Sequence, residues 1–68
     1  MIKENASTTA CQEGFACQNY DAFEESQLSV KLNDALVIVN DLDPEWWLAK
    51  CLRTGKCGFL PAEIVQVA

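Results

Sequence analysis

Apolar residues occur along this chain in short runs, separated by polar and turn-forming segments. Runs of about four to eight residues that are rich in β-branched and aromatic side chains are typical of strands, whose pleated surface accommodates such side chains. None of these runs shows the apolar period of a helix. We therefore expect strands over residues 15–20, 35–39, 46–52, 56–60 and 64–67.

The segments between these runs have the composition of turns and loops. Residues 40–45 combine Asn and Asp, which make local side-chain hydrogen bonds, with a proline that cannot join a ladder. Thr54 and Gly55 indicate a tight hairpin turn, and Pro61 is expected to end a strand. Several short strands joined by such turns indicate an all-β protein, and a five-stranded barrel fits this length.

Alternate positions in the expected strands share one face, because successive side chains of a strand point to opposite faces. Small and medium apolar residues at such positions are expected to form one compact core. Trp46 and Trp47 are neighbours on one strand, so the barrel interior cannot hold both. The expected core residues are Ala16, Leu28, Val30, Leu36, Ile38, Ala49, Cys51, Leu60 and Val65.

Length and charge limit the organisation and the class of partner. The 68 residues suffice for one domain, expected over residues 14–68 after a flexible leader at residues 1–13. Ten acidic residues against five basic ones and no His give a net charge of -5. This charge disfavours nucleic acid and anionic membranes and favours basic or neutral protein partners. Without a signal-like start or a membrane-spanning apolar stretch, we expect a cytoplasmic protein.

Four cysteines, Cys11, Cys17, Cys51 and Cys57, give the spacing Cys-x5-Cys twice. Paired zinc ligands are usually about two to four residues apart, so the spacing disfavours zinc. An even number of cysteines could instead form disulfides. Cys17 and Cys51 lie in apolar strand patterns, and we expect free thiols with no metal or other cofactor. With no His, no phosphate-binding glycine loop and no activated nucleophile, we expect no enzyme.

Four motifs, in order and at matching spacing, resemble the SH3 domain family. The resemblance covers residues 15–67 and implies a small five-stranded SH3-like barrel with a short 3-10 turn before the last strand. Residues 16–20 match the family's opening Ala-Leu-Tyr-Asp-Tyr, residues 28–34 its Leu-Ser-Phe-Lys-Lys-Gly-Asp turn, Trp46-Trp47 its tryptophan pair, and residues 58–65 its closing Gly-Tyr-Ile-Pro-Ser-Asn-Tyr-Val.

Two further details accompany the resemblance. Asn33 stands where the family prefers Gly, and Asn tolerates a left-handed backbone better than other non-Gly residues. Residues 46–49 and 61–63 resemble, more faintly, the SH3 domains of fungal cell-polarity scaffold proteins.

The resemblance implies a shallow aromatic groove for extended, proline-containing peptides, which lose little entropy on binding. Trp46 is the implied anchor, able to stack on proline and to donate its indole N–H. Trp47 is expected to pack on the barrel instead. The implied ligand-binding residues are Tyr20, Trp46, Phe59, Pro61, Gln18, Ile64, Glu63, Glu25 and Gln27.

Two acidic loops are expected to flank this groove and to favour Arg or Lys in the ligand. Glu25 is the best single candidate for that contact. The acidic residues are Asp21, Glu24 and Glu25 in the first loop and Asp41, Asp43 and Glu45 in the second.

The chain departs from the family at several groove positions. Gln18 and Ile64 stand where the family has Tyr, Glu63 stands where it has Asn, and Gln27 replaces the acidic residue that usually meets the ligand's Arg. We therefore expect generic peptides that combine Arg with Pro-x-x-Pro to bind weakly.

Two functions remain open from the sequence. The leading prediction is an adaptor module that binds short proline-containing motifs within a larger scaffold or signalling protein. The alternative is an atypical SH3 domain that binds a non-proline motif or a folded partner surface. The apolar patch for that alternative would comprise Leu32, Val37, Leu42, Leu48 and Ile64.

Overall fold

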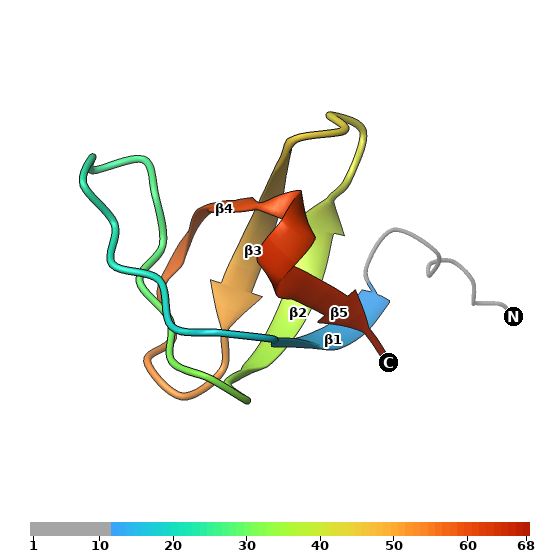
Figure 1. The fold of residues 1–68 in the computed structure, drawn as a ribbon, viewed down its shortest axis with the longest axis horizontal. Helices are drawn as coiled ribbons and strands as arrows, with labels where there is room; N and C mark the ends of the chain where they lie inside the picture. Colours follow the sequence, from blue (N-terminus) through green and yellow to red (C-terminus); the bar gives the residue numbers. More distant parts are fainter. Residues whose placement is uncertain (1–11) are drawn as a thin grey trace, which may run out of the picture.

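The computed structural model describes residues 12–68, and its five strands form one antiparallel sheet that curls into a half-barrel (Figure 1). The order of the strands in the sheet is β4-β3-β2-β1-β5. The predicted SH3-like fold, with a 3-10 turn before the last strand, is confirmed. The elements are β1 (Gln12–Ala16), β2 (Ala35–Asn40), β3 (Trp46–Cys51), β4 (Cys57–Pro61), the 3-10 helix η2 (Ala62–Ile64) and β5 (Val65–Val67).

The first strand begins and ends earlier than the hydrophobic pattern predicts. Gln12 and Glu13, placed in the leader from the sequence, pair with Ile38 and Val37 of β2. Tyr20 lies beyond the end of β1 and forms an isolated bridge with Val30. Backbone pairing does not require apolar side chains, so β1 extends into polar sequence. The rest of the predicted leader, residues 1–11, lies outside the described residues.

The barrel interior is filled as the alternation of apolar residues predicts. All nine expected core residues are buried, and Val65, at 9% exposed, is the most accessible of them. Ile64 of η2 joins this cluster with 1% of its surface exposed, and Trp47 packs against it. The short 3-10 helix therefore closes one side of the core.

A buried carboxylate organises the turn that leads into β2. Asn33 has a φ of 71°, the left-handed conformation expected from its match to a family glycine. Asp34 accepts hydrogen bonds from the Lys31 backbone N–H at 2.8 Å and from two guanidinium nitrogens of Arg53 at 2.8 and 2.9 Å. The hydrogen bonds from Arg53, followed by the bond from the Lys31 N–H, hold the pKa of Asp34 well below its ordinary value.

Replacing this carboxylate is expected to lower stability at neutral pH and much less in acid. A carboxyl group with a depressed folded-state pKa stabilises the fold above its unfolded pKa of about 3.9, and that contribution is lost as the pH falls toward the folded-state value. Asp34→Asn should therefore lower the thermal midpoint at about pH 7 and approach the wild type near about pH 2. Arg53→Ala removes the other partner of the same ion pair and serves as the matched variant. An Asn variant whose deficit is the same at both pH values would contradict this role.

Candidate functional site

The outer surface of β3 and β4 carries an aromatic face. Trp46 pairs directly with Pro61, and Leu48 pairs with Phe59. Along β3 these positions alternate with the inward-facing ones, since Ala49 is fully buried in the core. We call Trp46, Leu48, Phe59 and Pro61 the aromatic face.

Trp46 separates two hollows of similar size on this side of the molecule. The first, of about 410 Å³, lies toward the long loop at residues 17–34, and we call it the loop-side hollow. The second, of about 400 Å³, lies toward η2, and we call it the turn-side hollow. Among residues 12–68, only Trp46 lines both. The loop-side hollow is lined by Phe23, Glu24, Ser26, Gln27, Trp46 and Phe59, and the turn-side hollow by Pro44, Glu45, Trp46, Pro61, Ala62 and Glu63.

The long loop is attached to the aromatic face through its backbone. Gln27 forms a parallel bridge with Phe59 of β4. The Phe59 N–H donates to the Ser26 carbonyl at 2.8 Å, and the Leu28 N–H donates to the Phe59 carbonyl at 2.9 Å. Because Leu28 is 2% exposed, this attachment also fixes a core side chain. The wall of the loop-side hollow is therefore held by the sheet itself.

Side-chain hydrogen bonds converge on Gln27 within the same wall. The Tyr20 hydroxyl donates to Gln27 Oε1 at 3.0 Å, and the Phe23 backbone N–H donates to the same oxygen at 3.1 Å. Tyr20 itself is half-buried and packs against the core. It therefore supports the groove wall through Gln27 and does not line either hollow.

The loop before β3 positions Trp46 from the other side. Asp43 Oδ1 accepts hydrogen bonds from the backbone N–H groups of Glu45 at 2.7 Å and Trp46 at 3.1 Å. These two bonds, that from Glu45 being the larger influence, lower the pKa of Asp43. Such an Asp-centred turn satisfies backbone donors where the strand begins. The sequence predicts a turn at residues 40–45. The structure shows that the hydrogen bonds of Asp43 in this turn hold the backbone where β3 begins, at Trp46.

The structure brings together most, but not all, of the residues expected to bind a ligand. Trp46, Phe59 and Gln27 meet at the loop-side hollow, and Pro61 and Glu63 join Trp46 at the turn-side hollow.

Ile64, expected both as a groove residue and as part of an apolar patch, is 1% exposed. The one-turn helix η2 directs this side chain into the core. The expectation of an exposed Ile64 is therefore wrong, and this residue is not available to a ligand.

Two other expected residues lie away from the hollows. Gln18 is exposed just after β1 and lines neither of them. Glu25 lines a separate polar cleft, whereas its neighbour Glu24 borders the loop-side hollow as well as that cleft. Glu24 is therefore the acidic residue of the long loop that borders the aromatic face.

Sequence reasoning did not single out Phe23 and Pro44. Phe23 is 72% exposed near the tip of the long loop and borders the loop-side hollow. An aromatic residue inside an otherwise polar loop is a usable signal, since exposed aromatics concentrate at binding surfaces. Pro44 was read only as a turn residue, yet it lines the turn-side hollow.

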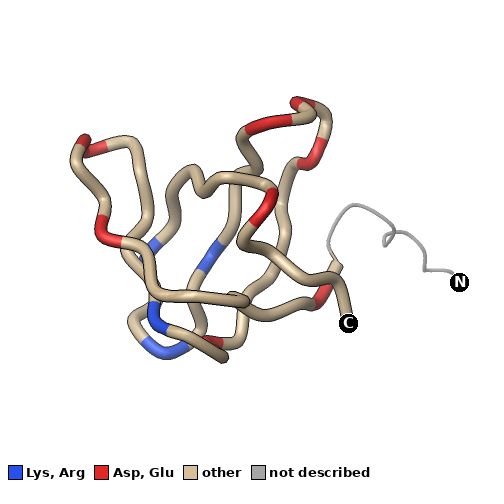
Figure 2. The backbone as a smooth tube through the Cα atoms, viewed as in Figure 1, with Lys and Arg blue, Asp and Glu red and all other residues tan. Residues whose placement is uncertain are grey.

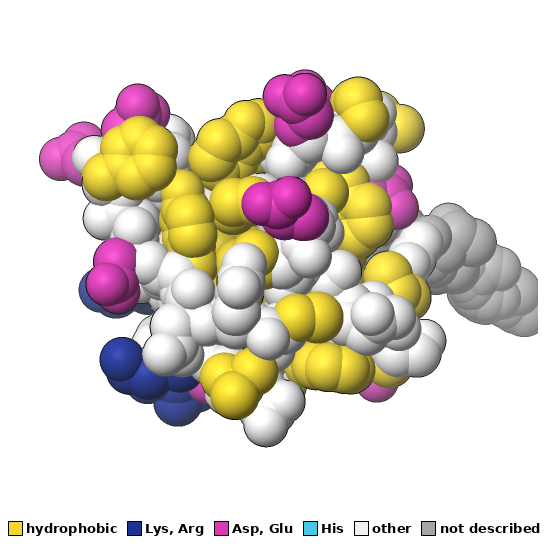
Figure 3. Space-filling model, viewed as in Figure 1, with side chains coloured by type: hydrophobic (Ala, Val, Ile, Leu, Met, Phe, Trp, Pro, Cys, Tyr) yellow, Lys and Arg dark blue, Asp and Glu magenta, His cyan; other side chains and the backbone are white. Residues whose placement is uncertain are grey.

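Charge is unevenly distributed over the fold. Acidic residues occupy the long loop and the β2–β3 loop, whereas basic residues gather at the opposite end, around the β3–β4 turn (Figure 2). Hydrophobic side chains lie between the two acidic loops in the space-filling view (Figure 3). An apolar surface bordered by carboxylates suits a ligand that is apolar along its length and basic nearby.

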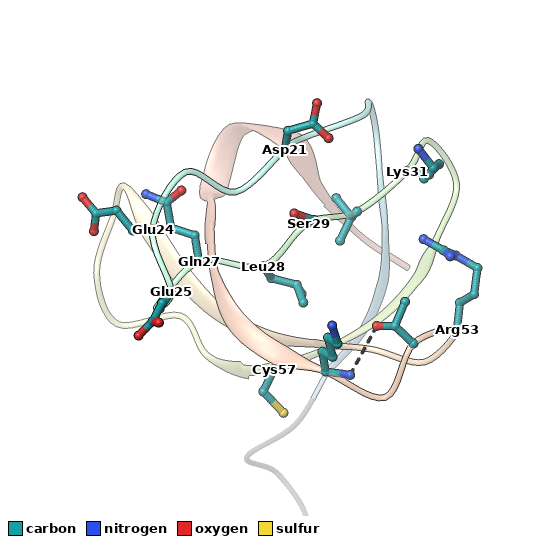
Figure 4. A pocket seen from close by; sticks show the side chains of 12 residues that line it. Asp21, Glu24, Glu25, Gln27, Leu28, Ser29, Lys31, Arg53 and Cys57 are labelled. Carbon is teal, nitrogen blue, oxygen red and sulfur yellow. Dashed lines mark hydrogen bonds between the residues drawn. The ribbon is translucent and has the colours of Figure 1, made fainter.

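The polar cleft, of about 510 Å³, lies between the long loop and the β3–β4 turn (Figure 4). Its lining residues include the carboxylates of Asp21 and Glu25 and the cations of Lys31 and Lys56. Opposite charges across an open cleft can attract one another. None of the residues that line this cleft is aromatic. The aromatic face is therefore the better candidate for binding a peptide.

The described part of the chain offers no metal centre. Within residues 12–68 no group of three or more His, Cys, Asp or Glu side chains is placed to hold a metal ion. Cys51 is buried, and Cys17 and Cys57 are exposed, all three as free thiols. The expectation that Cys17 lies inside a strand is wrong, because β1 ends at Ala16. Cys11 lies outside the described residues. In the same range, no helix has the length and apolar character needed to cross a membrane.

Comparisons with known proteins bear on both the sequence and the fold. The SH3 domain family matches residues 16–62. The myosin IC heavy chain of Dictyostelium discoideum is 34% identical over 55 residues, which are 81% of this chain and 5% of that protein. The solved structure of CED-2 has a TM-score of 0.77 at 23% identity, covering 84% of this chain and 33% of that one. The chain thus spans a small part of either protein, and the likeness to CED-2 concerns the fold.

Proposed function

This chain belongs to the SH3 domain family, whose members are non-catalytic protein–protein interaction modules, and from that premise we propose that it binds short, extended, proline-containing segments of a partner protein. The observation that carries the proposal is the position of Trp46 between two hollows of about 400 Å³ each. A polyproline helix advances about 3.1 Å per residue and needs no internal hydrogen bonds. The side chains of such an extended helix can occupy the two hollows on either side of Trp46.

The same proposal includes an adaptor role within a larger scaffold or signalling protein, in the cytoplasm and without a cofactor. The match to a short part of a myosin heavy chain supports the placement of such a domain in a longer chain. Residues 14–68, together with Gln12 and Glu13 of β1, are proposed as the folded binding unit.

A display screen tests the proposal directly. Peptide libraries with and without fixed prolines are selected on the purified domain, and the enriched peptides are retested in solution. Enrichment of proline-containing sequences is expected. Enrichment only of sequences without proline would overturn proline recognition and favour the alternative below.

Binding of a basic peptide is expected to weaken as salt is added. Carboxylates of the long loop and of the β2–β3 loop border the aromatic face, and Glu45 lines the turn-side hollow. Exposed charges are screened beyond about 10 Å at 0.1 M salt. Titration of one selected basic peptide and of its Lys-to-Ala or Arg-to-Ala counterpart at several salt concentrations measures the effect. If the affinity of the basic peptide is independent of salt, the acidic loops take no part in recognition.

A second candidate function is binding of a folded partner surface. It is favoured by two apolar side chains exposed on the loops that flank the aromatic face, Phe23 at 72% and Leu42 at 86%. Exposed apolar residues at loop tips can widen a contact beyond a peptide groove. A partner that still binds Trp46→Ala but not a Phe23→Ser, Leu42→Ser double variant would support this second function.

A further inference from the structure

The amide of Gln27 is held in one orientation by its neighbours. The backbone N–H of Phe23 lies 3.1 Å from Oε1, and a backbone N–H can only donate. The oxygen of the amide must therefore face Phe23, and the same oxygen also accepts from the Tyr20 hydroxyl. Exchanging the oxygen and nitrogen of the amide would place two donors against each other.

This orientation determines what Gln27 can offer a ligand. An amide oxygen has two lone pairs, and the two internal hydrogen bonds use both. The Nε2 group retains two N–H donors that have no protein partner among residues 12–68. Gln27 lines both the loop-side hollow and the polar cleft, and its remaining hydrogen-bonding capacity is that of a donor.

Two other polar side chains line this hollow, the Ser26 hydroxyl, which can both donate and accept, and the Glu24 carboxylate, which limits the ligand further. Glu24 borders the same space with a carboxylate that accepts hydrogen bonds and repels negative charge. A ligand carboxylate would accept from Gln27 but face Glu24. A ligand guanidinium has donors only, so it would satisfy Glu24 but leave Gln27 unpaired, and exposed ion pairs contribute little. A neutral carboxamide can accept from Gln27 and donate to Glu24.

We infer that the loop-side hollow selects a ligand residue with a neutral carboxamide, Asn or Gln, next to the segment that lies on Trp46. The inference rests on the proposed peptide-binding function and names the chemistry that this site recognises. Gln27 is the specificity-determining residue, with Glu24 excluding an acidic alternative.

The substitution Gln27→Glu tests the Nε2 donors separately from the hydrogen bonds to Oε1 that hold the wall of the loop-side hollow. A glutamate at this position keeps an oxygen that accepts from Tyr20 and Phe23, replaces the free N–H donors by an acceptor and adds a negative charge. The probe is a synthetic peptide, Ala-Pro-Pro-Ala-Pro-Pro-Ala, extended at either end by one residue that is Gln, Met, Arg or Glu. Amide chemical-shift titration gives the dissociation constant of each peptide for the wild type and for the variant.

We expect the wild type to bind the Gln peptide about three- to tenfold more tightly than the Met peptide of similar length, the range that one net hydrogen bond gives. The variant should prefer the Arg peptide. In the wild type, the Gln27 side-chain amide signals should shift with the Gln peptide and not with the Met peptide, a readout that does not depend on the variant folding. A wild type that prefers Arg or Glu, or fails to discriminate, overturns the inference.

Failure of the underlying function has a different signature. If the peptides bind equally well to Trp46→Ala, or if none binds and the display screen enriches nothing, the proposed function fails and the inference falls with it. If binding requires Trp46 but ignores the variable residue, the proposed function stands and only the selection by Gln27 is overturned.

Discussion

Trp46→Ala is expected to weaken binding of peptides selected on the wild-type domain by about 30-fold or more, which corresponds to about 2 kcal/mol at a binding hot spot. The indole is the only side chain of the described residues that lines both hollows, so its removal merges them and takes away the surface on which an extended ligand stacks. Trp46 is half-buried on the outer face and is not part of the core cluster. The variant should therefore fold, with a native amide spectrum and a modest loss of stability.

Trp47→Ala is the matched control from the adjacent position. Trp47 packs against the core cluster, and its indole Nε1 is buried without a hydrogen-bond partner in the part of the chain that the structure describes. Its truncation should reduce stability by about 3 kcal/mol, as expected for a large core-facing aromatic side chain, and change the affinity of the remaining folded protein less. Titration of both variants, with urea denaturation of each, separates the two effects. The site is misassigned if Trp46→Ala unfolds the domain or if Trp47→Ala is the more damaging to binding.

The alternation of apolar residues was sufficient to predict the core and four of the five strands to within one residue at each end. In β2 and β3, buried residues such as Leu36 and Ala49 alternate with more exposed neighbours, so the pattern is visible in the sequence. The same rule separated Trp46 from Trp47. β1 was harder, since Gln12 and Glu13 are exposed strand residues that are held by backbone pairing alone.

Positions outside regular strands could not be read from periodicity. Ile64 is in a one-turn 3-10 helix, where neither the strand period nor the α-helical period predicts which way a side chain points. The choice between Glu24 and Glu25 depends on how the long loop bends over β4, which a bridge at Gln27 and Phe59 decides. The orientation of the Gln27 amide depends on the same loop geometry.

The attachment of the long loop to β4 leads to a large expected effect on stability. Gly58→Ala should lower the free energy of unfolding by about 3 kcal/mol, the upper range for overpacking a core. An added Cβ would lie 2.8 Å from the Gln27 carbonyl carbon and 2.9 Å from the Leu28 nitrogen, both backbone atoms. The loop backbone at Gln27 and Leu28 cannot move aside without breaking its bridge to β4. The buried side chain of Leu28 and the wall of the loop-side hollow are therefore displaced together. For a domain of this size such a loss is a large part of the total stability.

Gly55→Ala distinguishes this backbone clash from the general cost of replacing glycine. Gly55 has a φ of 77°, so alanine is strained there, but an added Cβ would meet nothing within 4 Å. Its expected cost is about 1 kcal/mol, the cost of a left-handed backbone for an alanine. Gly55→Ala should also leave peptide binding unchanged, because this residue lines neither hollow, whereas the folded fraction of Gly58→Ala should bind more weakly. Urea denaturation of the two variants, followed by titration under native conditions, gives the comparison. Equal destabilisation by the two substitutions would mean that the loop does not lie against β4 as closely as described, and the shape of the loop-side hollow would then be wrong as well.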